Sequence, residues 1–401
     1  MKRVALLCLG LAVGAASVAE AQLTMQMSNG WSFTFGGNVN AFLVYDDVSG
    51  GGTDFFGGKG ATGIRTGLLP AFAVLDAKGK EGNTDLGVHF GFAPQIQCGY
   101  DTDRAGTSGS SVNGQGHDCF GAQIDMRQVY LTVGGSWGTI LAGRELGLFG
   151  RQNILNDQTL FGVGATGGPA GSGTTLGRIG FGYIYPQFKA QMTYTTAAGR
   201  PFQLSIGLFQ PATNPPFVTI QLPRVEAEGV WSSGNTKVWV GGEAQSNKTD
   251  PTVAGADASG FAWGGTGGFR FGTPMISVTA TGYYGKGIGD ILGFLGGAVG
   301  TGANGSDDLT KSYGGYGQVT VTPAGSKVTL AGSWGLSALK SASSLATPKN
   351  DRWLASGGVY YQATKSLRVV GEFNYATFRD GVPATEDVKE IAPAFGFMLF
   401  F

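Results

Sequence analysis

The chain has 401 residues, of which 42% are hydrophobic and only 13% are charged, and this hydrophobic fraction excludes an intrinsically disordered protein. Lysine and arginine together number 27 and balance 27 aspartates and glutamates, so nothing favours nucleic acid or a strongly acidic partner. No linker or break in composition divides the chain. A single domain is therefore expected after the N-terminal segment.

The N-terminal segment has the features of an export signal. Two basic residues precede an apolar stretch of about fifteen residues, and the sequence AEA at 19–21 matches the small-x-small pattern of a signal peptidase site. The apolar stretch is too short to span a bilayer as a helix. We predict a signal peptide over residues 1–21 and an exported mature domain over residues 22–401.

The mature chain alternates apolar and polar residues with a period of two. In the segment 84–97, Val88 and Phe90 share one face while His89 lies on the other. The last segment, EIAPAFGFMLFF, has one wholly apolar face that includes Phe395 and Phe397. A period of two predicts β-strands, each with an apolar face.

The predicted strands are joined alternately by short turns and by long connections rich in Gly, Ser and Asp. They span residues 32–45, 61–76, 84–97, 122–134, 136–145, 177–196, 202–212, 224–233, 236–247, 258–271, 274–288, 311–324, 326–338, 351–363, 366–378 and 390–401. Irregular spacing near residues 185–187 predicts a bulge in the sixth strand.

Strand length separates the two architectures that this alternation allows. A soluble sandwich would bury the apolar faces between two sheets, but its strands usually have about five or six residues. The segments here are about twice as long, as tilted strands that cross a bilayer must be. The sequence therefore predicts an all-β fold: a transmembrane antiparallel β-barrel of about sixteen strands, with lipid outside and a water-filled lumen inside. The last strand should pair with the first.

One segment resembles a known family. MRQVYLTVGGSWGTILAGRELGLFGRQN, residues 126–153, is similar to the RQ-aromatic-x-GL…FG-x-x-x-x-GR core of the trimeric general porins of Gram-negative bacteria, of the neisserial and enteric type. The matching residues are Arg127, Gln128, Tyr130, Trp137, Gly138, Gly143 and Arg144. Weaker similarities extend the resemblance over nearly the whole mature chain.

The resemblance implies a function and partners. The expected protein is a homotrimer in outer-membrane lipid, and its channel passes ions and small hydrophilic solutes by passive diffusion. The terminal Phe401 resembles the signal that the outer-membrane assembly machinery recognises. Neither a cofactor nor a metal is expected.

The resemblance also implies a constriction inside the barrel. In the family the long third outer loop folds inward, and its acidic residues face a ladder of basic side chains on the wall. The corresponding connection here runs from about Glu145 to Thr175. The ladder candidates are Arg65, Arg127 and Arg178; Arg144 is expected at the loop base, and the loop charges are Glu145, Arg151 and Asp157.

The alternation places these arginines unequally. Arg65 and Arg178 lie on the opposite face of their strands from the apolar residues and should therefore face the lumen. Arg127 lies on the same face as apolar residues of its strand. Each could equally be an ordinary wetted lumen residue. Other charges expected to face inward are Arg270, Lys327, Arg368, Glu226, Glu228, Glu243 and Glu372. Because the wall is mixed, we expect at most a mild preference for one sign of ion.

Two cysteines remain after removal of the signal peptide, Cys98 and Cys119, at the two ends of the predicted second outer loop. An oxidising compartment favours a disulfide between them. A cation site is the other interpretation, with His117, Asp118, Asp101 and Asp103 as ligands.

Three other functions were weighed against a passive channel. An outer-membrane phospholipase would need a His and a Ser at the lipid-facing rim, and neither His89 nor His117 is placed there. Catalysis is therefore not expected. A pore selective for a sugar or an organic anion is the main alternative, followed by a non-conducting surface protein.

Overall fold

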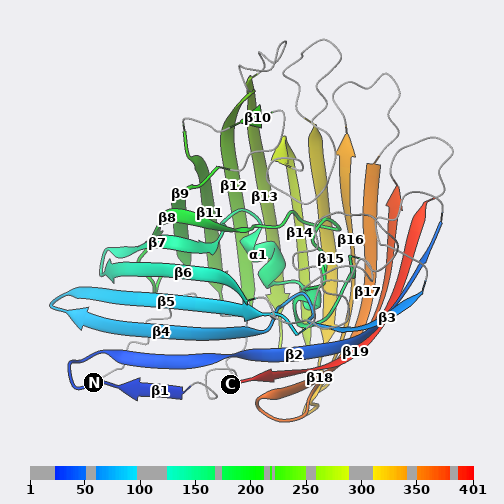
Figure 1. Ribbon diagram of the computed structural model, residues 1–401, viewed down its shortest axis with the longest axis horizontal. Coiled ribbons are helices and arrows are strands. Elements are labelled where there is room, and N and C mark those ends of the chain that lie inside the picture. The colour runs from blue at the N-terminus through cyan, green and yellow to red at the C-terminus, as the bar shows by residue number, and fades with distance from the viewer. Residues whose placement is uncertain are drawn as a thin grey trace, which may run out of the picture.

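The computed structural model describes residues 23–50, 60–96, 124–167, 174–211, 217–218, 222–249, 259–288, 310–340, 350–379 and 387–401. The predicted signal peptide lies outside the described residues, as do Cys98, Cys119 and the acidic and histidine residues between them. The described part is one antiparallel sheet that closes on itself, because the last strand pairs with β2 (Figure 1). None of the helices found there is long and apolar enough to cross a membrane.

Sixteen strands form the wall, one of them in two pieces. In chain order they are β2 (Ser32–Ser49), β3 (Ala61–Arg65) with β4 (Phe72–Glu81), β5 (Thr84–Pro94), β6 (Ile124–Gly135), β7 (Gly138–Leu146), β8 (Phe188–Thr196), β9 (Phe202–Phe209), β11 (Arg224–Ser233), β12 (Thr236–Thr249), β13 (Ser259–Gly272), β14 (Ile276–Lys286), β15 (Lys311–Val321), β16 (Val328–Lys340), β17 (Asn350–Gln362), β18 (Leu367–Arg379) and β19 (Val388–Phe400). Two short strands are added to this wall: β1 (Leu23–Gln26) pairs with β2, and β10 (Phe217–Val218) pairs with β12. The predicted barrel and its strand number are confirmed.

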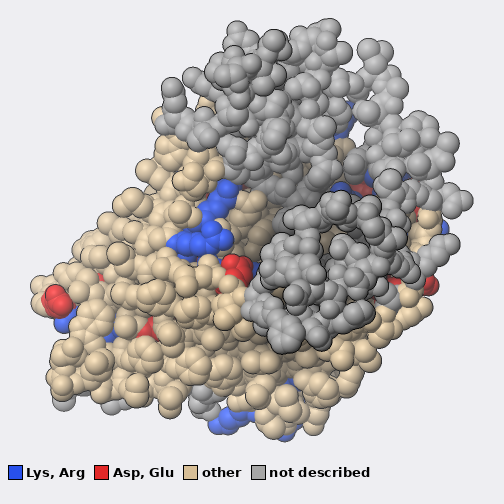
Figure 2. All heavy atoms as spheres, viewed as in Figure 1, with Lys and Arg blue, Asp and Glu red and all other residues tan. Residues whose placement is uncertain are grey.

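The outward faces of the strands are apolar, as the alternation predicts. Phe90, Phe269 and Leu330 point away from the barrel and are 38, 43 and 48% exposed. Inward neighbours are polar and buried, as His89 shows at 4%. Among the described residues visible in Figure 2, most of the surface is neither acidic nor basic. Such a surface suits contact with hydrocarbon, in which an exposed Arg or Lys costs about 2–4 kcal/mol at the bilayer midplane.

The barrel closes at a seam between β2 and β19, the first and last long strands of the wall. The backbone N–H of Phe401 donates to the Gly37 carbonyl at 3.0 Å, and the Phe401 carbonyl accepts from the Gly37 N–H at 2.8 Å. The ring of Phe401 lies 5.4 Å from that of Phe35. The terminal aromatic residue is therefore part of the sheet, and the predicted pairing of the last strand with the first is confirmed.

The predicted strand 61–76 is interrupted by residues 66–71, which leave the sheet. Asn38 and Asn40 of β2 donate to backbone carbonyls of this segment at 3.1 and 2.9 Å, so side chains replace part of the lost ladder. Leu68 and Phe72 are turned into the interior and are only 5% exposed. Both are among the apolar neighbours that alternate with Arg65 and were therefore expected on the lipid face. That expectation is wrong, because the ladder does not continue through residues 66–71.

The sixth predicted strand, 177–196, is also shorter than expected. β8 begins only at Phe188, and Gln187 has a φ of 60°, a left-handed conformation that a strand cannot contain. The preceding residues belong to a loop instead. The predicted bulge near 185–187 is therefore wrong, whereas a register shift that the sequence did not reveal occurs between Gly91 and Phe92, opposite β6.

Candidate functional site

The connection between β7 and β8, residues 147–187, folds into the barrel, and we call it the third loop. It contains a short helix, α1 (Arg151–Leu155), and a 3₁₀ turn, η2 (Gln158–Phe161). Figure 1 shows α1 among the wall strands, and most described residues of the loop are buried. The loop extends about a dozen residues beyond the predicted end near Thr175, because the first part of the predicted sixth strand belongs to it.

Carboxylates on the barrel wall hold the loop backbone. Glu226 of β11 accepts two consecutive loop N–H groups at 2.6 and 2.9 Å. Glu372 of β18 accepts those of Val163 and Gly164 at 3.2 and 2.6 Å, and Glu390 of β19 accepts one more at 2.7 Å. A typical intramolecular hydrogen bond contributes about 0.5–1.5 kcal/mol, and more where the acceptor is charged. The resemblance did not imply these wall carboxylates, which contact the loop backbone in addition to the charges expected on the loop itself.

Asn153 of α1 connects the helix to four neighbouring strands. Its side-chain oxygen accepts from Trp239 of β12 at 2.9 Å and from Thr281 of β14 at 2.7 Å. Its amide nitrogen donates to Thr266 of β13 at 2.9 Å, and its backbone carbonyl accepts from Tyr316 of β15 at 2.7 Å. Sequence reasoning missed Asn153, because no local pattern announces a residue whose partners lie 86–163 positions away.

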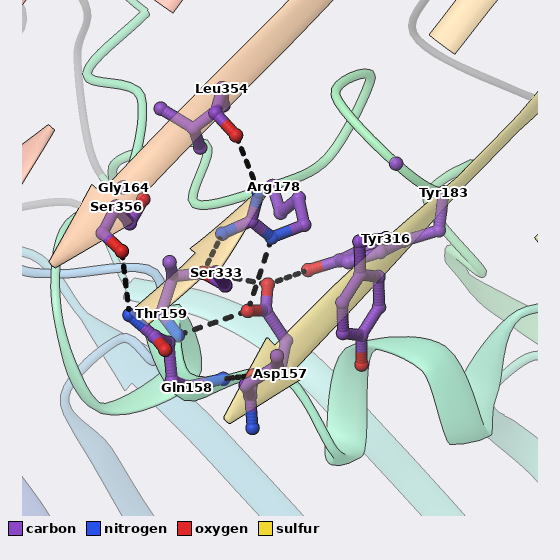
Figure 3. Close-up of polar contacts among 12 residues, drawn as sticks. Asp157, Gln158, Thr159, Gly164, Arg178, Tyr183, Tyr316, Ser333, Leu354 and Ser356 are labelled. Atoms are coloured by element: carbon purple, nitrogen blue, oxygen red, sulfur yellow. Dashed lines mark hydrogen bonds and ion pairs between the residues drawn. The ribbon is translucent and has the colours of Figure 1, made fainter. Parts of the chain in front are cut away.

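Asp157 and Arg178 form a fully buried ion pair between two parts of the third loop (Figure 3). The Arg178 Nε lies 3.5 Å from Asp157 Oδ1, and Tyr183 donates to Asp157 Oδ2 at 2.9 Å. Burial and the neighbouring Asp157 carboxylate raise the pKa of Tyr183 well above its usual value. Tyr183 therefore stays protonated and remains a donor.

Arg178 also fastens the loop to the wall. Its Nη1 donates to the Leu354 carbonyl of β17 at 3.0 Å, and its Nη2 donates to the Ser333 hydroxyl of β16 (Figure 3). The prediction that Arg178 stands on a wall strand is thus wrong, because the residue belongs to the loop. Its contacts hold the loop in place.

The other two ladder candidates lie elsewhere. Arg65 of β3 points inward, is 4% exposed and donates to the Thr174 carbonyl at 3.4 Å. Arg127 of β6 forms an ion pair with Asp125 at 2.7 Å. Arg65 and Arg127 thus stand on wall strands near the loop, whereas Arg178 belongs to the loop itself.

The register shift in β6 explains the parity of Arg127. Met126 is paired with Phe92 and Gln128 with Gly91, which leaves Arg127 as the extra residue of a bulge. A bulge re-aims a side chain that strict alternation would send to the other face. Arg127 accordingly borders an interior cavity and lies 5.8 Å above the ring of Phe188.

The base of the loop is held by Glu145. Its carboxylate accepts from Gln128 at 2.8 and 3.0 Å and from the backbone N–H of Leu146 at 2.6 Å. Arg144, expected in this role, is exposed at the end of β7 and has no ion pair with any described residue. Arg151 of α1 forms an ion pair with Glu228 of β11 at 2.6 Å.

Further pairing neutralises other charges of the lumen. Arg224 of β11 forms ion pairs with Glu226 and, at 3.8 Å, with Glu243. Asp46 of β2 accepts from the Thr166 hydroxyl at 2.7 Å. Asp46 and Glu390 were not among the predicted residues. Glu390 alternates with apolar residues that share the other face of the closing strand, and this was a usable signal.

No described residues form a hydrolytic or metal centre. His89 is held by Asp76, 2.9 Å away, and stacks on Tyr130 with 4.5 Å between ring centres. Its Nε2 has no hydrogen-bond partner, so no hydroxyl is bound to it as a nucleophile would be. Across the described ranges, no group of three or more His, Cys, Asp or Glu residues could hold a metal ion.

Comparison with known proteins agrees with this geometry. The profile of the Gram-negative porin family matches residues 5–381, most of the chain. The chain belongs to the Gram-negative porin family. This porin is therefore an outer-membrane channel for the passive diffusion of solutes, as the sequence predicted. No curated protein sequence is similar enough to count as a match.

Solved structures of outer-membrane proteins share the fold of this porin. The outer membrane channel DcaP of Acinetobacter baumannii superposes with a TM-score of 0.67 at 14% identity, over 94% of this chain and 99% of that one. The anion-selective porin of Comamonas acidovorans superposes with a TM-score of 0.62 at 12% identity, over 92% of this chain and 100% of that one. The trimer form of OmpT from Vibrio cholerae superposes with a TM-score of 0.54 at 14% identity, over 93% of this chain and 100% of that one.

Proposed function

We propose that this porin is a general channel with little selectivity between cations and anions. The observation that carries the proposal is the pairing of the fixed charges in the lumen. Arg178 is paired with Asp157, Arg151 with Glu228, and Arg224 with Glu226 and Glu243. Paired charges largely cancel one another at a distance, so they produce only a weak field across the channel.

We further propose that the third loop sets the narrowest part of the path. The wall carboxylates and the Asp157–Arg178 pair hold the loop inside the barrel, so its position is fixed by buried charged contacts. Arg65, Arg127 and Arg151 remain the candidates for residues that passing solutes meet. Glu145 holds the loop base, and Arg144 pairs with Val129 on the outward face of the wall. Asp157 and Arg178, which are fully buried, act by positioning the loop.

Reversal potentials test the proposed lack of selectivity. Purified protein would be inserted into planar lipid bilayers under a tenfold KCl gradient, with conductance steps counted per insertion. We expect stepwise openings and a reversal potential within a few millivolts of zero. A potential near the Nernst value of either ion would contradict a weak field and would favour the selective pore instead.

The assembly state is part of the proposal. We infer a homotrimer, supported by the trimer form in which the OmpT fold relative was solved. Phe401 completes the seam of the barrel, and we propose that this same terminal residue is read by the assembly machinery before the seam closes. Sedimentation in detergent would give the trimer mass, and deletion of Phe401 should lower the amount of assembled protein in the membrane.

A selective pore is the second candidate, and one observation favours it. The third loop and wall enclose an apolar cavity with a cationic rim, which a general channel does not need. Catalysis is not proposed, since His89 is engaged with Asp76 and carries no nucleophile.

A further inference from the structure

A cavity of about 160 Å³ lies between the third loop and the interrupted wall strand. Its apolar lining comes from both sides and includes Leu68, Leu69, Phe72, Leu146, Ile154 and Ile179. The inward turn of residues 66–71 supplies the first part of this lining. Most of the rest comes from the third loop, both from α1 and from residues 174–185. Apolar side chains at this position are unexpected in the lumen of a channel, where alternation should place polar ones.

The size and chemistry of the cavity limit what can occupy it. An apolar cavity of about 150 Å³ stays dry and accepts a molecule such as benzene, because water finds no hydrogen-bond partners there. The cavity here is of similar volume and mostly apolar, and its polar lining residues are Arg127, Thr174, Thr175 and Tyr185. One aromatic ring or a short branched aliphatic chain therefore fits it, and a disaccharide does not.

Arg127 borders the cavity and provides a charge. Its Nε is engaged by Asp125 at 2.7 Å, while the described residues offer its terminal Nη groups no acceptor. The guanidinium is 17% exposed and lies 5.8 Å above the ring of Phe188, which is also part of the lining. A guanidinium in this position can donate two parallel hydrogen bonds to a carboxylate.

The local balance of charge favours an anion. Arg127 is the one charged residue of the lining, and its partner Asp125 lies outside the lining. The Asp125 side chain is 44% exposed and that of Arg127 is 17% exposed, so water screens the carboxylate more than it screens the guanidinium. The site combines this guanidinium with a largely apolar interior.

We propose that this cavity binds small monocarboxylates whose body is a single aromatic ring or a short branched chain. The apolar body occupies the space between Leu69, Ile154 and Ile179, and the carboxylate accepts hydrogen bonds from Arg127. The role of this site in slowing solutes on their way through the channel rests on the channel function proposed above. Binding of a ligand to the site can be measured without any transport.

Benzoate is the probe, and it is compared with benzyl alcohol and acetate. Binding to purified protein in detergent at neutral pH would be followed by saturation-transfer NMR, with empty micelles as the blank. Benzyl alcohol has the ring without the charge, and acetate has the charge without the ring. We expect benzoate to bind at least about tenfold more tightly than either, because each part of the site contributes.

Substitutions at the rim separate the charge from the cavity. Arg127→Gln should weaken benzoate at least about tenfold and leave benzyl alcohol unchanged, since a hydrogen bond to a charged group contributes about 1.5–3 kcal/mol. Arg127→Lys should retain part of the affinity. Arg270→Gln is the matched control, because Arg270 is a half-buried arginine of β13 that bonds to Ser277 at 3.1 Å and does not line the cavity.

Filling the cavity tests the apolar part. Leu155→Trp places a larger side chain at a partly exposed lining position and should abolish binding of both benzoate and benzyl alcohol. Heat-modifiable migration on gels would establish that every variant is folded. Equal benzoate affinity in wild type and Arg127→Gln, or acetate that competes as well as benzoate, would overturn the proposal. Stepwise conductance in these same samples would show that the channel function stands regardless.

Discussion

The third loop is fastened differently on its two sides. Toward β11–β19 it is held by buried charge and hydrogen bonds, with Glu226, Glu372 and the Asp157–Arg178 pair as the main contacts. Toward β3 and β4 it rests on apolar side chains, among them Leu68 and Phe72. The first side fixes the direction and position of the loop backbone, because hydrogen bonds are directional. The second side fills space and leaves a cavity.

The difference has an energetic consequence. On the charged side, removing one partner leaves the other buried without compensation, which costs more than the contact itself contributes. On the apolar side, a smaller side chain enlarges a cavity that is already present, and the loss follows the area and volume removed. The following substitutions compare the two sides in order of expected effect.

Arg178→Ala should have the largest effect. It leaves the Asp157 carboxylate buried without its cation, and breaking a buried pair in this way destabilises a protein by about 3–5 kcal/mol. Urea unfolding in detergent, followed by intrinsic fluorescence, measures the loss. Arg270→Ala removes an arginine that is only half-buried and should cost much less; equal losses would contradict the special role of the Asp157 pair.

Leu68→Ala tests the apolar side and should destabilise the fold by about 2–5 kcal/mol, as large-to-small changes in cores do. The same urea titration applies. We expect the lower end of this range, because the site already borders a cavity. Leu330→Ala on the lipid-facing surface is the matched control and should be nearly neutral in detergent.

Glu372→Gln weakens the hold on the loop backbone at Val163 and Gly164. The neutral amide still accepts a hydrogen bond, so the loss should stay within about 1.5–3 kcal/mol. The informative measurement is single-channel current, in which a looser loop should give larger open-channel noise. Glu81→Gln, at an exposed turn, should leave the noise unchanged.

Arg144→Gln should have the smallest effect. Arg144 is exposed and makes no ion pair with the described residues, so the free energy of unfolding should barely change. The neighbouring change Glu145→Gln removes the carboxylate that Gln128 and Leu146 contact and should be clearly destabilising. If the Arg144 variant lost more free energy of unfolding than the Glu145 variant, Arg144 and not Glu145 would hold the base of the loop.

The sequence predicted the barrel well because strand periodicity is local. Val88 and Phe90 share a face whatever surrounds them, and the whole wall repeats this pattern. The lumen was predicted less well. Arg65 was placed correctly by its parity, but Arg127 was ambiguous because a bulge depends on the register with β5, which no single strand reveals.

The loop contacts could not be predicted for a similar reason. Arg178 and Ser333 are 155 residues apart, and Asn153 and Tyr316 are 163 apart, so only folding brings each pair together. The alternation around Arg178 predicts a strand, but this segment is part of the inward-folded loop. Such a loop also buries its apolar residues, among them Ile179 and Phe181, and so produces the same pattern. A period of two in a loop cannot be distinguished from a strand without its neighbours.

The sequence by itself determined that the chain forms a barrel of long amphipathic strands, since one apolar face per strand has no other stable solution in lipid. The tertiary structure decided where the third loop lies, which carboxylates hold it and where an apolar cavity remains. The physical reason is range: side-chain alternation acts between adjacent residues, whereas buried ion pairs and hydrogen bonds act between strands that are distant in the chain.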